Sequence, residues 1–133
     1  MDEPFLEATI SIRGVIRRSD GSVLVIRRAS DDGWELPGGR IHRNESVRDC
    51  LVREIDEETG LDASVHGPVE ATAWQNRSGR GRFAVYYRCT TDTRSVTLSD
   101  EHTDAEWVGG AHARDRLSDP QAAATARAVS ADD

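Results

Sequence analysis

The sequence contains no lysine, and all 17 of its basic residues are arginine. Its 24 acidic residues outnumber them, and the formal net charge of −7 argues against a general affinity for the nucleic-acid backbone. An acidic surface without lysine suggests adaptation to high salt, where screening weakens the repulsion between negative charges. A GC-rich genome that favours arginine codons predicts the same composition, so salt adaptation and codon bias both stay open.

Long hydrophobic runs are also absent. No stretch of about 18 apolar residues occurs, and the first ten residues lack a basic region followed by an apolar core. The sequence therefore predicts neither a membrane span nor a signal peptide. We expect a cytoplasmic protein whose partners include no membrane and no nucleic acid.

Metal-binding patterns of cysteine and histidine are missing as well. Cys50 and Cys89 lie in a predicted helix and a predicted strand, so we expect reduced residues in the core or at its boundary, with an intramolecular disulfide as the alternative. The histidines lack the paired spacing of a zinc site: His42, His66, His102 and His112. There is no P-loop, so the sequence does not support kinase or ATPase chemistry.

The length and the order of predicted elements indicate one domain, residues 1–133, with an α/β fold. Strands are expected at residues 6–18, 23–26, 34–36, 63–75, 83–90 and 107–108. Helices are expected at residues 45–59, 111–117 and 121–129, followed by a frayed end at 130–133. This order predicts a mixed β-sheet covered by helices, an α/β/α sandwich.

The first predicted helix organises the chain. Asn44 is a suitable N-cap, and Gly60 suits the left-handed residue that ends a helix. At about 100° per residue, four apolar residues form a stripe that should face the core: Val47, Leu51, Val52 and Ile55.

Three glutamates of the same helix, Glu54, Glu57 and Glu58, fall within an arc of about 100° beside that stripe. Like charges at this spacing destabilise a helix by roughly 0.2–0.5 kcal/mol per pair. A hard divalent cation would offset the repulsion, because Mg²⁺ and Mn²⁺ take oxygen ligands. A solvated acidic helix face is the alternative interpretation of these three residues.

The complete pattern around them favours the metal. Gly39 is followed after five residues by Glu45 and, after seven more, by the run Arg-Glu-Ile-Asp-Glu-Glu-Thr-Gly-Leu that ends at Leu61. Residues 39–61 match the Nudix box at every defined position, and the chain resembles the MutT-like Nudix hydrolases. The resemblance implies the Nudix fold, with the box helix packed on the central sheet. It also implies hydrolysis of a nucleoside diphosphate derivative by water and Mg²⁺ or Mn²⁺, without a covalent intermediate.

The resemblance also assigns roles to residues. It implies that the metal ligands are Glu54, Glu57, Glu58 and the backbone carbonyl of Gly39. Arg53 would pair with Glu45 and hold the glutamates in place. The general base stays open between a box glutamate, such as Glu57, and a glutamate of a later loop. Glu101, six residues before Trp107, is the candidate in that loop and could also ligate a second metal.

Substrate recognition is less well defined by the sequence. Three arginines near a predicted hairpin tip could bind a substrate phosphate, although a solvated tip is the alternative: Arg77, Arg80 and Arg82. The short chain favours a nucleoside triphosphate pyrophosphatase of MutT type over an ADP-ribose or nucleotide-sugar pyrophosphatase. A non-catalytic nucleotide-binding sensor fits less well because the box is complete. A diphosphate isomerase, which shares the fold, also fits less well because that family typically needs a longer chain. A homodimer is possible in each case.

Overall fold

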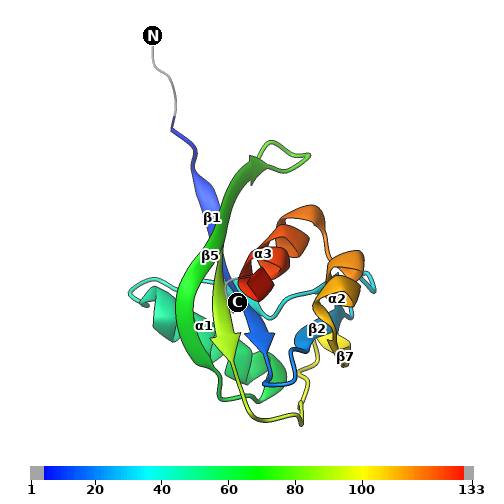
Figure 1. Ribbon diagram of the computed structural model, residues 1–133. Coiled ribbons are helices and arrows are strands. Elements are labelled where there is room, and N and C mark those ends of the chain that lie inside the picture. The colour runs from blue at the N-terminus through cyan, green and yellow to red at the C-terminus, as the bar shows by residue number, and fades with distance from the viewer. Residues whose placement is uncertain (1–4, 131–133) are drawn as a thin grey trace.

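The computed structural model describes residues 5–130, and Figure 1 shows it with several of its elements labelled. The strands are β1 (Ala8–Arg17), β2 (Val23–Arg28), β3 (Trp34–Glu35), β4 (Gly38–Arg40), β5 (Ser64–Gln75), β6 (Gly81–Thr90) and β7 (His102–Val108). The helices are α1 (Val47–Thr59), α2 (Gly110–Arg116) and α3 (Asp119–Ser130). β4 is an addition to the predicted elements, and β7 is longer than the two residues expected. Residues 131–133, part of the end for which we expect fraying, lie outside the described residues.

β1 is the central strand of a mixed sheet. It runs parallel to β6 along its whole length, from Ala8 opposite Gly81 to Arg17 opposite Thr90. Its other edge pairs antiparallel with β4 in the middle of the strand, at residues 11–13, and with β2 at its end. The strand order is β3–β2–β1–β6–β5, with β4 also beside β1 and β7 beside β2. β4 also contacts α1.

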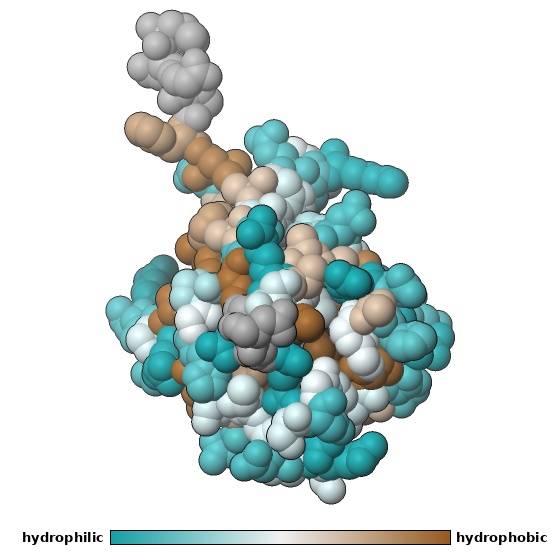
Figure 2. Space-filling view, viewed as in Figure 1, coloured by the Kyte–Doolittle hydropathy of each residue, from teal (hydrophilic) through white to brown (hydrophobic). Residues whose placement is uncertain are grey.

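Buried side chains fill a layer on each face of this sheet. Because side chains alternate along a strand, Ile12 and Ile16 of β1 pack with Leu51 and Ile55 of α1, whereas Val15 packs with buried alanines of α2 and α3. Figure 1 shows α1 on one side of the sheet and α2 with α3 on the other. The α/β/α sandwich is therefore confirmed. The surface seen in Figure 2 is mostly hydrophilic, and no helix within residues 5–130 is long and apolar enough to cross a membrane.

The start of α1 differs from the predicted one. The N-cap is Ser46, whose hydroxyl accepts a hydrogen bond from the backbone N–H of Asp49 at 3.1 Å. Asn44 instead has φ of +70° and turns the chain between β4 and the helix, a conformation that asparagine tolerates better than most residues. The predicted end is confirmed, because Gly60 has φ of +71° and donates to the carbonyl of Asp56.

The buried face of α1 is also shifted from the predicted stripe. Leu51 and Ile55 are buried as expected, but Val47 and Val52 are 37% and 41% exposed. The face turned to the sheet is instead completed by Cys50, Glu58 and Thr59. This rotation matters for function, because it carries one glutamate of the acidic arc into the interior.

Both cysteines are buried and free. The prediction of reduced residues in the core or at its boundary is confirmed, and the alternative of a disulfide between Cys50 and Cys89 is wrong.

Candidate active site

A cavity of about 940 Å³ opens where β4, the C-terminal half of α1 and the first halves of β1 and β6 meet. Its volume is in the range of small-molecule sites. Most of the predicted site residues line it: Gly39, Arg53, Glu54, Glu57, Glu58, Arg82 and Glu101. The structure thus brings residues that are far apart in sequence to one place.

Gly39 and Glu54 form the contact between β4 and α1. A Cβ atom added to Gly39 would lie only 2.5 Å from a carboxylate oxygen of Glu54. No larger residue can therefore occupy this position without displacing the carboxylate. The close approach brings the backbone of β4 beside the acidic arc.

Arg53 connects the carboxylates of the site. Its Nε donates to Glu45 at 2.6 Å, and its Nη1 donates to Glu54 at 2.9 Å and to Glu57 at 3.2 Å. A further hydrogen bond from Nη2 reaches the carbonyl of Arg40. The hydrogen bond from Arg53 lowers the pKa of Glu45 to about 2. The expected pairing of Arg53 with Glu45 is therefore present, and it restricts the positions of two further glutamates.

Glu58 is the buried member of the acidic arc, with 4% of its surface exposed. One carboxylate oxygen accepts a hydrogen bond of 2.9 Å from the backbone N–H of Gly38. Burial disfavours the charged carboxylate and raises the pKa of Glu58 to about 7, although the bond from Gly38 acts in the opposite direction. A cation beside this carboxylate would favour its charged form.

Glu101 lies in the loop of residues 91–101, which joins β6 to β7. The backbone N–H of Thr97 donates to Thr59 at 2.9 Å, and the Glu101 carbonyl accepts from Ala29 at 2.8 Å. The indole of Trp107 donates to the Arg94 carbonyl at 2.9 Å. These bonds hold the loop against α1 and the end of β2, and place Glu101 at the cavity.

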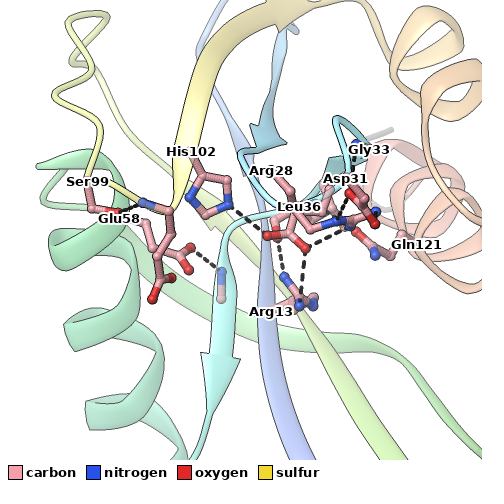
Figure 3. A network of polar contacts seen from close by, with 12 residues as sticks. Arg13, Arg28, Asp31, Gly33, Leu36, Glu58, Ser99, His102 and Gln121 are labelled. Carbon is pink, nitrogen blue, oxygen red and sulfur yellow. Dashed lines mark hydrogen bonds and ion pairs between the residues drawn. The ribbon is translucent and has the colours of Figure 1, made fainter.

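A buried polar group extends the site beneath Glu101. The Nε2–H of His102 donates to one carboxylate oxygen of Glu35 at 2.7 Å, and the other oxygen of Glu35 lies 3.0 Å from Arg28 and 3.5 Å from Arg13 (Figure 3). Burial raises the pKa of Glu35, but the bond with His102 and the two arginines outweigh burial and lower it overall. Burial likewise opposes the charged ring of His102, and the bond with Glu35 and the charge of Glu58 outweigh it, so the pKa of His102 is raised.

Comparison with known proteins identifies the family. The family model of the NUDIX domain matches residues 8–129. The chain belongs to the Nudix family.

Its relatives include pyrophosphohydrolases. A MutT-like protein of Streptomyces ambofaciens is 33% identical over 111 residues, which cover 84% of this chain and 70% of that protein. The CTP pyrophosphohydrolase of Escherichia coli is 36% identical over 75 residues, 53% of this chain and 55% of that protein. The MutT protein of Methanosarcina mazei shares the fold, with a TM-score of 0.82 at 22% identity over 98% of this chain and 99% of that one. The chain is thus a Nudix pyrophosphohydrolase, a class that generally uses divalent metals and acts on small nucleotide derivatives.

The arginines of this Nudix enzyme are not all at the cavity. Arg82 of β6 lines it and donates to the hydroxyl of Thr9 at 3.0 Å. Trp74 of β5 lies opposite Arg82 in the strand register, lines the same cavity and is 41% exposed. Arg77 and Arg80 belong to the turn between β5 and β6 and are not among the lining residues. Of the three arginines proposed to bind phosphate, the structure therefore places Arg82 at the cavity and the other two away from it.

Sequence reasoning missed Glu35 and His102. They are 67 residues apart, and neither belongs to a motif with fixed spacing. The available signal was their position, because each stands next to a residue of the recognised pattern: Glu35 shortly before the box and His102 directly after Glu101.

The donor set fits a divalent cation of the kind that Nudix hydrolases use. The carboxylates of Glu54, Glu57, Glu58 and Glu101 all line the cavity, and oxygen is the donor that hard divalent cations prefer. The glycine at position 39 leaves room for the backbone of β4 beside Glu54. Glu58 and Glu101 also approach His102, with one potential ligand atom of each of the three residues within 4.8 Å of the others.

Proposed function

We propose that this Nudix enzyme hydrolyses the diphosphate linkage of a nucleoside triphosphate and releases a nucleoside monophosphate and pyrophosphate. The observation that carries the proposal is the convergence of four glutamates, three from α1 and one from the loop of residues 91–101, on one cavity of about 940 Å³. The similarity to a MutT-like protein and to a CTP pyrophosphohydrolase supports a nucleoside triphosphate as the substrate class.

The same glutamates would hold the cofactor, which we propose to be Mg²⁺ or Mn²⁺. Glu54, Glu57 and Glu58, with the carbonyl of Gly39, would supply the ligands from the box, and Glu101 would supply one from the loop. When bound, such a cation neutralises charge on the diphosphate oxygens and lowers the pKa of a bound water. Arg53 would keep Glu54 and Glu57 in position through its two hydrogen bonds.

Glu101 is also the side chain that we assign as the general base, through the carboxylate oxygen that does not bind the cation. Its carboxylate is exposed and makes no hydrogen bond to any other side chain or backbone group within residues 5–130. Glu58 has one oxygen bound to Gly38, and Glu54 and Glu57 are bound to Arg53. Glu101 is thus the carboxylate best able to accept a proton from the attacking water.

The rest of the substrate would extend along β6 and β5. Arg82 offers a guanidinium group, which suits phosphate oxygens, and Trp74 offers a half-exposed indole on which a nucleobase can stack. Both side chains line the cavity that contains the glutamates. A triphosphate placed with its cleaved linkage at α1 could therefore reach them with its remaining groups.

The proposal is tested by a screen of nucleoside triphosphates, ADP-ribose, nucleotide sugars and dinucleoside polyphosphates with Mg²⁺ or Mn²⁺, in which the released products are identified. We expect release of pyrophosphate from a nucleoside triphosphate and no reaction with a chelator. Glu57→Gln should lower kcat by about a hundredfold or more, about 3 kcal/mol, because it removes a metal-binding charge.

Asp56→Asn is the matched control for this variant. Asp56 is the neighbouring acid on α1, it is exposed, and it does not line the cavity. Its kcat should stay within about twofold of the original, because surface substitutions have small effects. Full activity of Glu57→Gln would contradict the metal assignment. A preference for ADP-ribose or a nucleotide sugar would contradict the proposed substrate class.

A further inference from the structure

His102 has one ring nitrogen in use and one that is not. The residue is 6% exposed, and its Nε2 lies 2.7 Å from a carboxylate oxygen of Glu35. The other nitrogen, Nδ1, is buried and makes no hydrogen bond to any of the residues that the structure describes. A buried polar atom without a partner costs about 1–3 kcal/mol, so such an atom in a native protein needs an explanation, of which an ordered water and a bound ion are two.

The unpaired nitrogen faces two acids. Glu58, Glu101 and His102 each offer one potential ligand atom, and these atoms all lie within 4.8 Å of one another. Figure 3 shows the ring of His102 with one nitrogen bonded toward the side of Arg13 and Arg28 and the other on the side of Glu58. We call these three residues, Glu58, Glu101 and His102, the His102 site.

The surroundings of His102 match those of a metal-binding histidine. Such a histidine almost always donates its second ring N–H to a carboxylate, a backbone carbonyl or water, which fixes the tautomer and the orientation of the ring. Here Glu35 is that carboxylate, and Arg13 and Arg28 keep it negatively charged. With the proton on Nε2, the lone pair of Nδ1 is available for a cation.

We propose that Nδ1 of His102 is a metal ligand, and that the His102 site binds a divalent transition ion such as Mn²⁺, Co²⁺ or Zn²⁺ in preference to Mg²⁺. The preference follows from the donors, because imidazole nitrogen suits transition ions, whereas Mg²⁺ takes oxygen ligands. Binding of the ion releases the proton that Nδ1 carries when the ring is charged. The inference rests on the proposed metal-dependent function in one respect: the His102 site includes Glu58 and Glu101, which are also proposed to hold the catalytic cation.

A purely structural role for His102 is the competing explanation. The bond to Glu35 alone ties the first residue of β7 to β3 and would stabilise the fold without a cation. In that case the affinities for Mn²⁺ and Mg²⁺ would respond to changes at His102 in the same way. The two roles are therefore separated by metal binding measured without substrate.

The first measurement needs no variant. The ring nitrogens of the four histidines are followed by NMR in the full chain while Zn²⁺, which is diamagnetic, is added in the absence of nucleotide. We expect the Nδ1 resonance of His102 to move to the position of a metal-bound nitrogen with about one equivalent of the ion. An unchanged His102 ring, while Zn²⁺ binds elsewhere, would overturn the proposal.

The second measurement compares His102→Gln with His66→Gln by calorimetric titration of Mn²⁺ and Mg²⁺. His66 is an exposed histidine whose ring bonds to Thr90, so it is a control for loss of an imidazole. We expect His102→Gln to weaken Mn²⁺ binding about tenfold or more and Mg²⁺ binding by no more than about twofold. Equal losses for both ions, or none for Mn²⁺, would refute the role of Nδ1.

These measurements also stay separate from the proposed function. If no nucleotide is hydrolysed but His102 binds Zn²⁺ as expected, only the proposed activity fails. If nucleoside triphosphates are hydrolysed but the His102 ring does not respond, only the His102 site fails. Circular dichroism identifies an unfolded His102→Gln variant, and the NMR result then decides alone.

Discussion

Replacing Glu101 with glutamine removes one negative charge and keeps the size of the side chain. Glu101 lines the cavity from a loop that is far in sequence from the Nudix box, and a carboxylate oxygen of Glu101 can lie within 4.8 Å of one of Glu58. The variant therefore tests whether a loop acid takes part in a reaction that the motif assigns to α1. We expect kcat to fall about tenfold or more, with little change in the free energy of unfolding, because Glu101 has no ion-pair partner in residues 5–130.

The magnitude follows from the attraction between the Glu101 carboxylate and the proposed divalent cation. Glu101 is exposed, so the dielectric constant of water is the appropriate limit, and a unit charge about 4 Å from a doubly charged ion is then attracted by about 2 kcal/mol. Salt screens part of this attraction, and we take about 1.4 kcal/mol as the lower bound. That free energy corresponds to a factor of about ten in rate.

The assay is steady-state release of pyrophosphate at saturating metal, with Glu106→Gln as the matched control. The Glu106→Gln variant removes the same charge from β7, the strand that follows the loop with Glu101. Glu106 pairs with Arg116 and does not line the cavity. A surface ion pair is worth about 0–1 kcal/mol, so this control should change stability slightly and kcat by less than about twofold. Equal effects of the two variants on kcat would show that Glu101 has no catalytic role and that the base comes from α1.

If the lysine-free acidic surface reflects salt adaptation, Tm should rise between low and molar KCl, whereas a flat or falling Tm favours codon bias. Burial raises the pKa of Cys50 to about 11 and of Cys89 to about 12, so both thiols are protonated at about pH 8. A thiol reagent should then label them only after unfolding, and rapid labelling of the native protein would contradict their burial. Arg82→Gln should raise KM about tenfold or more while Arg77→Gln and Arg80→Gln leave it nearly unchanged; equal effects would place the phosphate at the turn.

The parts of the site that the sequence could predict are those set by helix geometry. Glu54, Glu57 and Glu58 stand at fixed spacing on α1, and helical periodicity alone directs them to one side. Periodicity did not determine how the helix is rotated against the sheet. The face of α1 that packs against the sheet is rotated from the purely apolar face. Glu58 is therefore buried, whereas Val52 is exposed.

The parts that could not be predicted depend on contacts between distant residues. Asn44 and Ser46 are both suitable N-cap residues. Asn44 lies in the turn that connects β4 to α1, so that Ser46 is the residue that caps the helix. The bond between Glu35 and His102 joins β3 to β7 across 67 residues, and the positions of the two residues beside the recognised pattern do not show that they are bonded to each other. A buried polar pair of this kind becomes visible only when the strands are in register.

The loop of residues 91–101 is held in place by the protein itself, through the bond between Thr97 and Thr59 and the bond between Ala29 and Glu101. Fixing the backbone of one residue costs about 1–2 kcal/mol in conformational entropy. For this loop the cost is met when the chain folds, so a cation or substrate that reaches Glu101 does not have to order it. Affinity at the site therefore depends on residues that touch no ligand. A substitution that loosens this loop should weaken cation binding even where every carboxylate is kept.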